Sequence, residues 1–211
     1  MFQHRRIPLE RRWQRLLALF ALVAAVMAGT VGIRSGQASG TTFEMVPSGA
    51  AVAAGCLANG HATVQITSLG FAERMRVSVS GLPASTEFDL FVIQVPDAKF
   101  GLSWYQGDIQ TDRRGRSTET FIGRFSEETF IVAPGSESAP VEHPADASTN
   151  PATAPVHTLH LGLWFNSPAD AAAAGCPNTV TPFNGDHTAG IQALSTRQFG
   201  PLDGPLGQVG S

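Results

Sequence analysis

The sequence predicts an all-β protein, an antiparallel β-sandwich of about seven to nine strands. In residues 74–80, Met75, Val77 and Val79 alternate with arginines and serines, which is the period of a strand with one buried face. Residues 88–95 are apolar at both even and odd positions, so both faces of this strand are expected to be covered. The turn residues Gly81 to Pro83 separate the two runs, and neither run has a helical period.

The first 38 residues predict an export signal. Five arginines and one glutamate precede an uncharged run of 18 residues from Leu16 to Ile33. This run is long for a signal peptide and just long enough to span a bilayer, so cleavage after Ala38 and retention as an N-terminal membrane anchor both stay open. In either case one domain over residues 39–199 and a flexible tail over 200–211 are expected outside the cytoplasm, secreted or anchored at the cell surface.

The charge of the exported part argues against nucleic acid as a partner. After residue 38 the chain carries eight basic and 16 acidic side chains, a net charge of −8. The remaining basic cluster, Arg113 to Arg116, belongs to a polar turn that is expected to join two strands. Contact with a membrane is expected only through an uncleaved N-terminal segment.

Two cysteines, Cys56 and Cys176, follow the same dipeptide Ala-Gly. An isolated pair in an oxidising compartment predicts one disulfide, and two free buried thiols are the alternative. The bond would close a loop of about 120 residues and stabilise the fold by roughly 4 to 5 kcal/mol on the chain-entropy estimate.

The other elements follow from the same patterns. Ser167 as N-cap, Pro168 in the first turn and Gly175 past the end predict one short helix over 168–174. A loop is expected at 47–60, and the Pro-, Ala- and Ser-rich stretch 134–155 is predicted to be a mobile loop. Further strands are expected at 41–46 on a sheet edge, 61–69, 99–111, 117–125, 127–133 and 157–165, with an Asn184-Gly185 hairpin turn between 179–183 and 189–199.

A resemblance is carried by residues 77–92, VSVSGLPASTEFDLFV. This stretch resembles the late strand, corner and strand of fibronectin type III and related immunoglobulin-like domains. The resemblance implies an immunoglobulin-like sandwich and no particular activity. In that family the position of Phe88 is normally a tyrosine whose hydroxyl bonds to the corner backbone, a bond that Phe88 cannot make.

Three aromatic residues allow a carbohydrate-binding hypothesis, because an exposed flat ring can stack on a sugar. Strand parity places Trp104 toward the core and Tyr105 outward, together with Ile109. Parity also places Trp164 on the face opposite the leucines of the 157–165 strand. Tyr105 and Trp164 are therefore the candidate platform for a glycan.

No nucleophile elbow, P-loop, dinucleotide fingerprint, HExxH or CxxC motif is present in the sequence. His160, Asp186 and His187 could share a metal ion if two late strands pair, which gives a metal-binding protein or metal-dependent hydrolase as the third hypothesis. The leading hypothesis is a non-catalytic, extracytoplasmic interaction module without a cofactor, whose partner is a protein or glycan at the cell surface. A carbohydrate-binding module is the alternative.

Overall fold

The computed structural model of the protein describes residues 40–97, 99–125, 157–182 and 188–209. The predicted export signal, the strand at 127–133, the loop at 134–155 and the Asn-Gly turn lie outside the described residues. The described residues all belong to one compact unit. Within the described ranges, no helix is long and apolar enough to cross a membrane.

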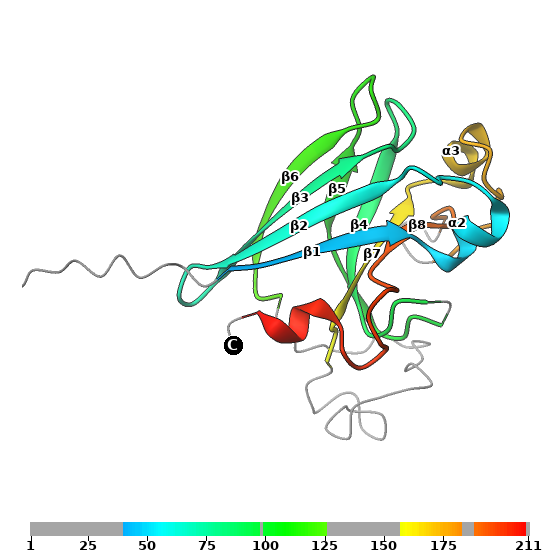
Figure 1. Cartoon of the computed structure of the whole chain (residues 1–211). Helices are drawn as coiled ribbons and strands as arrows, with labels where there is room; N and C mark the ends of the chain where they lie inside the picture. The colour runs from blue at the N-terminus through cyan, green and yellow to red at the C-terminus, as the bar shows by residue number, and fades with distance from the viewer. Residues whose placement is uncertain (1–39, 98, 126–156, 183–187, 210–211) are drawn as a thin grey trace, which may run out of the picture. The chain divides into compact units, whose positions relative to one another are not determined.

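These ranges form eight strands, two short α-helices and one 3₁₀ helix (Figure 1). The strands are β1 (Gly40–Pro47), β2 (His61–Ser68), β3 (Glu73–Ser80), β4 (Glu87–Ile93), β5 (Ser103–Gln110), β6 (Ser117–Gly123), β7 (His160–Phe165) and β8 (Gln192–Ser195). The helices are α2 (Gly49–Ala54), α3 (Pro168–Ala173) and η1 (Pro205–Gln208).

The strands form one antiparallel sheet in the order β5-β4-β7-β8-β1-β2-β3-β6. Its two halves meet at a short pairing between β1 and β8, at Val46 with Ser195 and Pro47 with Leu194. The end strands β5 and β6 are consecutive in the chain and lie close together, so the sheet comes near to closing as a barrel. The all-β class and the number of strands are confirmed, whereas the single curved sheet differs from a sandwich of two separate sheets.

The main core lies inside this curved sheet. β3 buries Met75, Val77 and Val79 inside and turns Arg74 and Arg76 to solvent, as its alternation predicts. β4 is covered on both faces. Its inner residues join the main core, and Phe91 and Ile93 join a second, smaller cluster on the outer face with Trp164 and Ala189.

Three expectations about the ends of the chain and the loops are wrong. β1 is not an edge strand, because it pairs with β2 on one side and with β8 on the other. The expected loop at 47–60 contains α2, whose first turn is capped by Ser48. The tail beyond Gly200 is ordered as far as Val209, because Leu206 in η1 is fully buried in the main core.

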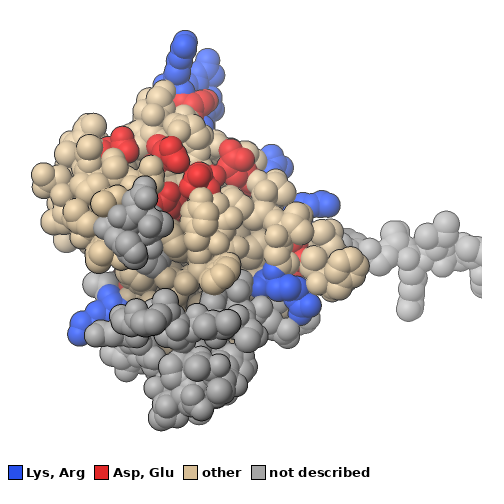
Figure 2. Space-filling model, turned by 180° about the vertical axis from the view of Figure 1, so that it is seen from behind, with Lys and Arg blue, Asp and Glu red and all other residues tan. Residues whose placement is uncertain are grey.

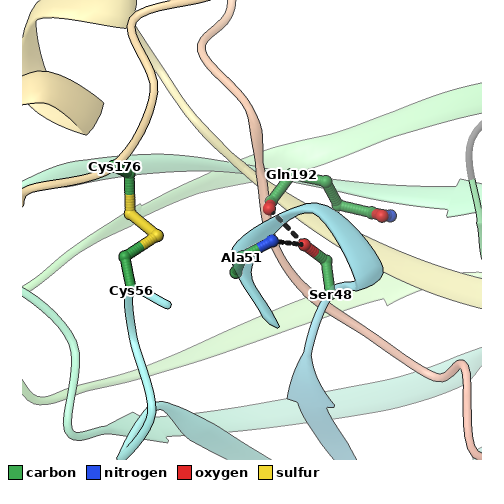
Figure 3. The surroundings of a disulfide bond; sticks show 5 residues. All are labelled: Ser48, Ala51, Cys56, Cys176 and Gln192. Atoms are coloured by element: carbon green, nitrogen blue, oxygen red, sulfur yellow. Dashed lines mark hydrogen bonds between the residues drawn. A yellow bond between two sulfur atoms is a disulfide. The ribbon is translucent and has the colours of Figure 1, made fainter. Parts of the chain in front are cut away.

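The predicted disulfide is present between Cys56 and Cys176, whose Cα atoms are 5.5 Å apart (Figure 3). It joins the chain just after α2 to the chain just after α3, and α3 has the predicted N-cap, Ser167. Close to the disulfide, the buried Ser48 Oγ accepts a hydrogen bond from Ala51 N (3.0 Å) and donates one to the carbonyl oxygen of Gln192 (2.5 Å). The disulfide and Ser48 therefore both tie α2 to late parts of the chain.

The corner between β3 and β4 is held by a residue from another strand end. Phe88 lies fully buried against Phe165 and makes no polar contact with the corner. Instead Thr111 Oγ1 donates to the carbonyl oxygen of Pro83 (2.7 Å) and accepts from Thr86 N (2.9 Å). A buried threonine thus supplies the backbone bonds that the resemblance assigns to a tyrosine.

Candidate functional site

The outer face of β4 and β5 presents a half-exposed aromatic ring among carboxylates. Tyr105 on β5 is 47% exposed, and its ring packs on Phe91 of β4 with 5.4 Å between centroids. Its hydroxyl donates a hydrogen bond of 2.5 Å to Asp108 Oδ1. We call this region the acidic aromatic face: Tyr105, Asp108 and Glu87 reach solvent, and the buried Phe91 and Asp89 lie beside them.

A β-bulge brings Tyr105 and Asp108 onto one face. Two residues three apart on a regular strand point to opposite faces. The register between β4 and β5 shifts between Leu90 and Phe91, which pair with Gly107 and Tyr105, so Gln106 is the extra residue. The bulge also turns Ile109 inward, where it is fully buried. The expectation that Ile109 lies outward with Tyr105 is therefore wrong.

The carboxylates give this face a negative potential that acts on Tyr105. Burial raises the pKa of the Tyr105 hydroxyl, and the hydrogen bond to Asp108 and the charges of Asp108, Asp89 and Glu87 raise it further. The phenol is therefore a neutral hydrogen-bond donor at physiological pH. Figure 2 views the molecule from the side on which β4 and β5 lie, and acidic side chains gather there.

Trp164 is not an exposed platform, although parity correctly placed it away from the main core. It is 1% exposed, and its indole makes edge contacts with Phe91 (5.7 Å between centroids) and Phe100 (5.0 Å). Phe100 from the segment before β5 and Ala189 from the segment before β8 cover it. A second small core on the outer face has therefore buried the ring that was expected to bind a glycan, and Trp164 instead supports Phe91 beneath Tyr105.

Trp104 was expected in the core and is 54% exposed. It pairs with Val92, whose side chain is fully buried in the main core. However, β5 is the end strand of the sheet order, so in the described residues Trp104 has a hydrogen-bonded neighbouring strand on one side only. Trp104 and Tyr105 are consecutive and therefore lie on opposite sides of the strand.

His160 is fully buried and has partners on both ring nitrogens. Pro201 O, which can only accept, lies 3.1 Å from Nε2, so Nε2 carries the proton and Nδ1 accepts from Thr196 Oγ1 at 2.9 Å. Burial lowers the pKa of His160, which keeps the ring neutral. Neither nitrogen is available for a metal, so the expected role of His160 as a ligand is wrong for this arrangement.

The other two candidate metal ligands, Asp186 and His187, lie outside the described residues. In the part of the chain that the structure describes, no group of three or more His, Cys, Asp or Glu side chains could hold a metal ion.

A shallow hollow lies on the opposite half of the sheet, over β2, β3 and the turn before β6. Within it His61 Nε2 is 2.8 Å from Ser80 Oγ, and Nδ1 is 3.2 Å from the carbonyl oxygen of Asn59. The Asp112 carboxylate at its rim accepts from the backbone N–H groups of Arg116 and Arg114, and these bonds lower the pKa of Asp112. The described residues that line the hollow offer hydroxyl and imidazole groups to solvent and include no phenylalanine, tyrosine or tryptophan.

The sequence matches no protein-family model and no curated protein. The role of the acidic aromatic face is therefore argued from its geometry alone. The sequence predicts Tyr105 as a candidate but not its partner Asp108, which would lie on the opposite face of a regular strand. The signal that could have shown the bulge is Gly107, since a glycine inside a strand pattern often marks one.

Proposed function

We propose that the protein is an exported, non-catalytic interaction module that binds a cationic group of a partner protein through the acidic aromatic face. The observation that carries the proposal is the Tyr105 ring, which is fixed on Phe91 and by Asp108 and still has nearly half of its surface exposed. A ring that is already ordered loses little conformational entropy when a partner binds.

The charges around the ring favour a lysine or arginine as the bound group. A cation over the face of a tyrosine is attracted by about 0.5 to 2 kcal/mol, depending on its desolvation. Glu87, Asp89 and Asp108 add a favourable field at the same place. The chain after residue 38 has a net charge of −8, which also attracts a positively charged group.

Binding of a fluorescent oligo-lysine peptide, measured by anisotropy, tests this function. The intact protein should bind the peptide, and binding should weaken as salt rises because the attraction is electrostatic. Tyr105→Ala should weaken binding about five-fold or more, and Asp108→Asn should also weaken it. The matched control is Trp104→Ala, an exposed aromatic on the other side of the same strand, which should leave binding unchanged. Equal losses in the two aromatic variants would show that Tyr105 has no special role.

A glycan is the second candidate ligand, because the ordered Tyr105 ring lies beside carboxylates that can accept hydrogen bonds from sugar hydroxyls. This ligand should bind with little dependence on salt, and Tyr105→Phe should retain stacking. A glycan array probed with the wild type and Tyr105→Ala separates the two ligands.

Export is part of the proposal and is supported by the arginine-rich start, the 18-residue apolar run and the disulfide. A reporter enzyme that is active only outside the cytoplasm, fused after Ser211, should be active. Deletion of residues 16–33 should abolish that activity, and an active deletion variant would contradict export through this segment.

A further inference from the structure

The turn between β2 and β3 carries the most exposed of the large apolar side chains in the described residues. Phe71 is 88% exposed and Leu69 is 41% exposed. On the neighbouring β6, Ile122 is 62% exposed and pairs with Arg74 of β3, so these two lie side by side. We call Leu69, Phe71, Ile122, Arg74 and Arg124 the tip surface.

The tip surface belongs to ordered backbone. Leu69 N donates to the carbonyl oxygen of Ala72 (2.7 Å) and closes the turn. Arg124 Nη1 donates to the carbonyl oxygen of Phe71 (3.4 Å), which joins the turn to the end of β6. The backbone that carries the exposed apolar side chains is therefore fixed by hydrogen bonds.

The charged groups of the tip surface are cationic. Arg74 and Arg124 are exposed. The acid next to Arg74, Glu73, is buried and accepts a hydrogen bond from Phe125 N (2.5 Å), and Glu127 and Glu128 follow in the sequence outside the described residues. Exposed phenylalanine and leucine side chains flanked by arginines match the composition of segments that lie at a membrane interface.

The start of the described chain lies at the same end of the sheet. Gly40 pairs with Thr67, two positions before Leu69. The apolar run that could be retained as a membrane anchor ends at Ile33, seven residues before Gly40. Seven residues span at most about 25 Å when extended, so a retained anchor would keep this end of the domain near the bilayer.

We propose that the tip surface docks on a lipid bilayer that contains anionic headgroups. Phe71 and Leu69 enter the boundary between headgroups and acyl chains, and Arg74 and Arg124 lie at the phosphate groups. Membrane contact is then not limited to the N-terminal segment. This contact is separate from partner binding at Tyr105, so either one can fail without the other.

The test uses the full chain, with its N-terminal segment intact, in vesicles of phosphatidylcholine and phosphatidylglycerol. Because Cys56 and Cys176 are bonded to each other, Phe71→Cys introduces a single thiol that can carry an environment-sensitive dye. Lipids with a nitroxide quencher near the headgroup should reduce its fluorescence by about two-fold or more. Unchanged thermal midpoints should verify folding, and Ile122→Cys provides a second position.

The matched control is Arg113→Cys in the turn before β6, at the other end of that strand. Its dye should not be quenched. Equal quenching at both positions, or none at Phe71, overturns the proposal. A signal at Phe71 that follows the protein-to-lipid ratio rather than the quencher would indicate contact between two copies of the chain and would also overturn it.

Discussion

At the scale of single residues, side chains with similar sequence surroundings end in different environments. Trp104 and Trp164 both follow strand patterns, yet one is 54% exposed and the other 1% exposed. The difference arises from segments far away in the sequence: Phe100 and Ala189 cover Trp164. Parity gives the face of a strand on which a residue lies, but it does not give what covers that face.

Replacing Trp164 should therefore be costly, whereas replacing Trp104 should not. Trp164→Ala removes a buried ring that contacts Phe91 and Phe100 and should lower the free energy of unfolding by about 3 to 5 kcal/mol. For a domain of this size, the thermal midpoint should fall by roughly 10 °C or more. Trp104→Ala should shift the midpoint by no more than a degree or two. Similar midpoints for the two variants would mean that the small outer cluster contributes little to stability.

The burial of His160 should make the protein less stable in mild acid. Burial lowers its native pKa, although Asp97 and the carbonyl oxygens at Pro201 and Gly200 oppose this shift. The neutral ring contributes its full stability above the unfolded pKa of about 6.5. This contribution is lost as the pH falls below that value toward the lower native pKa, because the unfolded chain binds a proton that the native ring does not.

Urea unfolding at a series of pH values measures this loss. The expected slope between pH 6.5 and the native pKa is at most about 1.4 kcal/mol per pH unit. NMR titration should find that the native His160 ring takes up its proton at a lower pH than a histidine of the unfolded chain, and a ring that titrates near its ordinary pKa would refute the assignment.

At the scale of elements, the sequence predicts most of the strands and one helix. β3, β4, β6 and α3 begin within one residue of the expected positions, because alternation, apolar runs and the Ser-Pro start of a helix are local signals. The helix α2 was missed because GAAVAA follows Pro47 and Ser48 without a charge or an apolar period. Its stability comes from Ser48, which caps the helix and bonds to Gln192, a residue 144 positions away.

The disulfide is the covalent counterpart of these long-range bonds. Replacing both cysteines by alanine opens a loop with a sequence separation of 120 residues and should lower the free energy of unfolding by about 4 to 5 kcal/mol, since the unfolded chain gains freedom. Guanidinium unfolding of the double variant and of the reduced wild type should give similar values. Alkylation of both thiols in the folded, non-reduced protein would contradict the bond.

At the scale of the whole molecule, the sequence does not distinguish a sandwich from a sheet that nearly closes. The difference depends on two residue pairs between β1 and β8 and on the approach of β5 to β6. β8 has only four residues, so it offers little pattern of its own. We call the place where β5 approaches β6 the seam. The bulge that places Asp108 beside Tyr105 lies in β5, so the candidate site depends on the seam as well.

Gly107 sets how closely β5 and β6 approach. It has a φ of +150°, and a Cβ atom added there would lie 2.7 Å from Cε1 of Phe121 on β6. Gly107→Ala should therefore cost about 1 to 3 kcal/mol of unfolding free energy, through overpacking and backbone strain. Gly70→Ala is the matched control for strain, because Gly70 has a φ of +92° and open space at the Cβ position.

Adding Phe121→Leu to Gly107→Ala should recover part of the lost unfolding free energy if the Phe121 ring is the obstacle. Hydrogen exchange should report faster opening of β5 and β6 in Gly107→Ala. A cost no larger than that of Gly70→Ala would mean that the seam tolerates the methyl group and that only the glycine backbone conformation matters at the bulge.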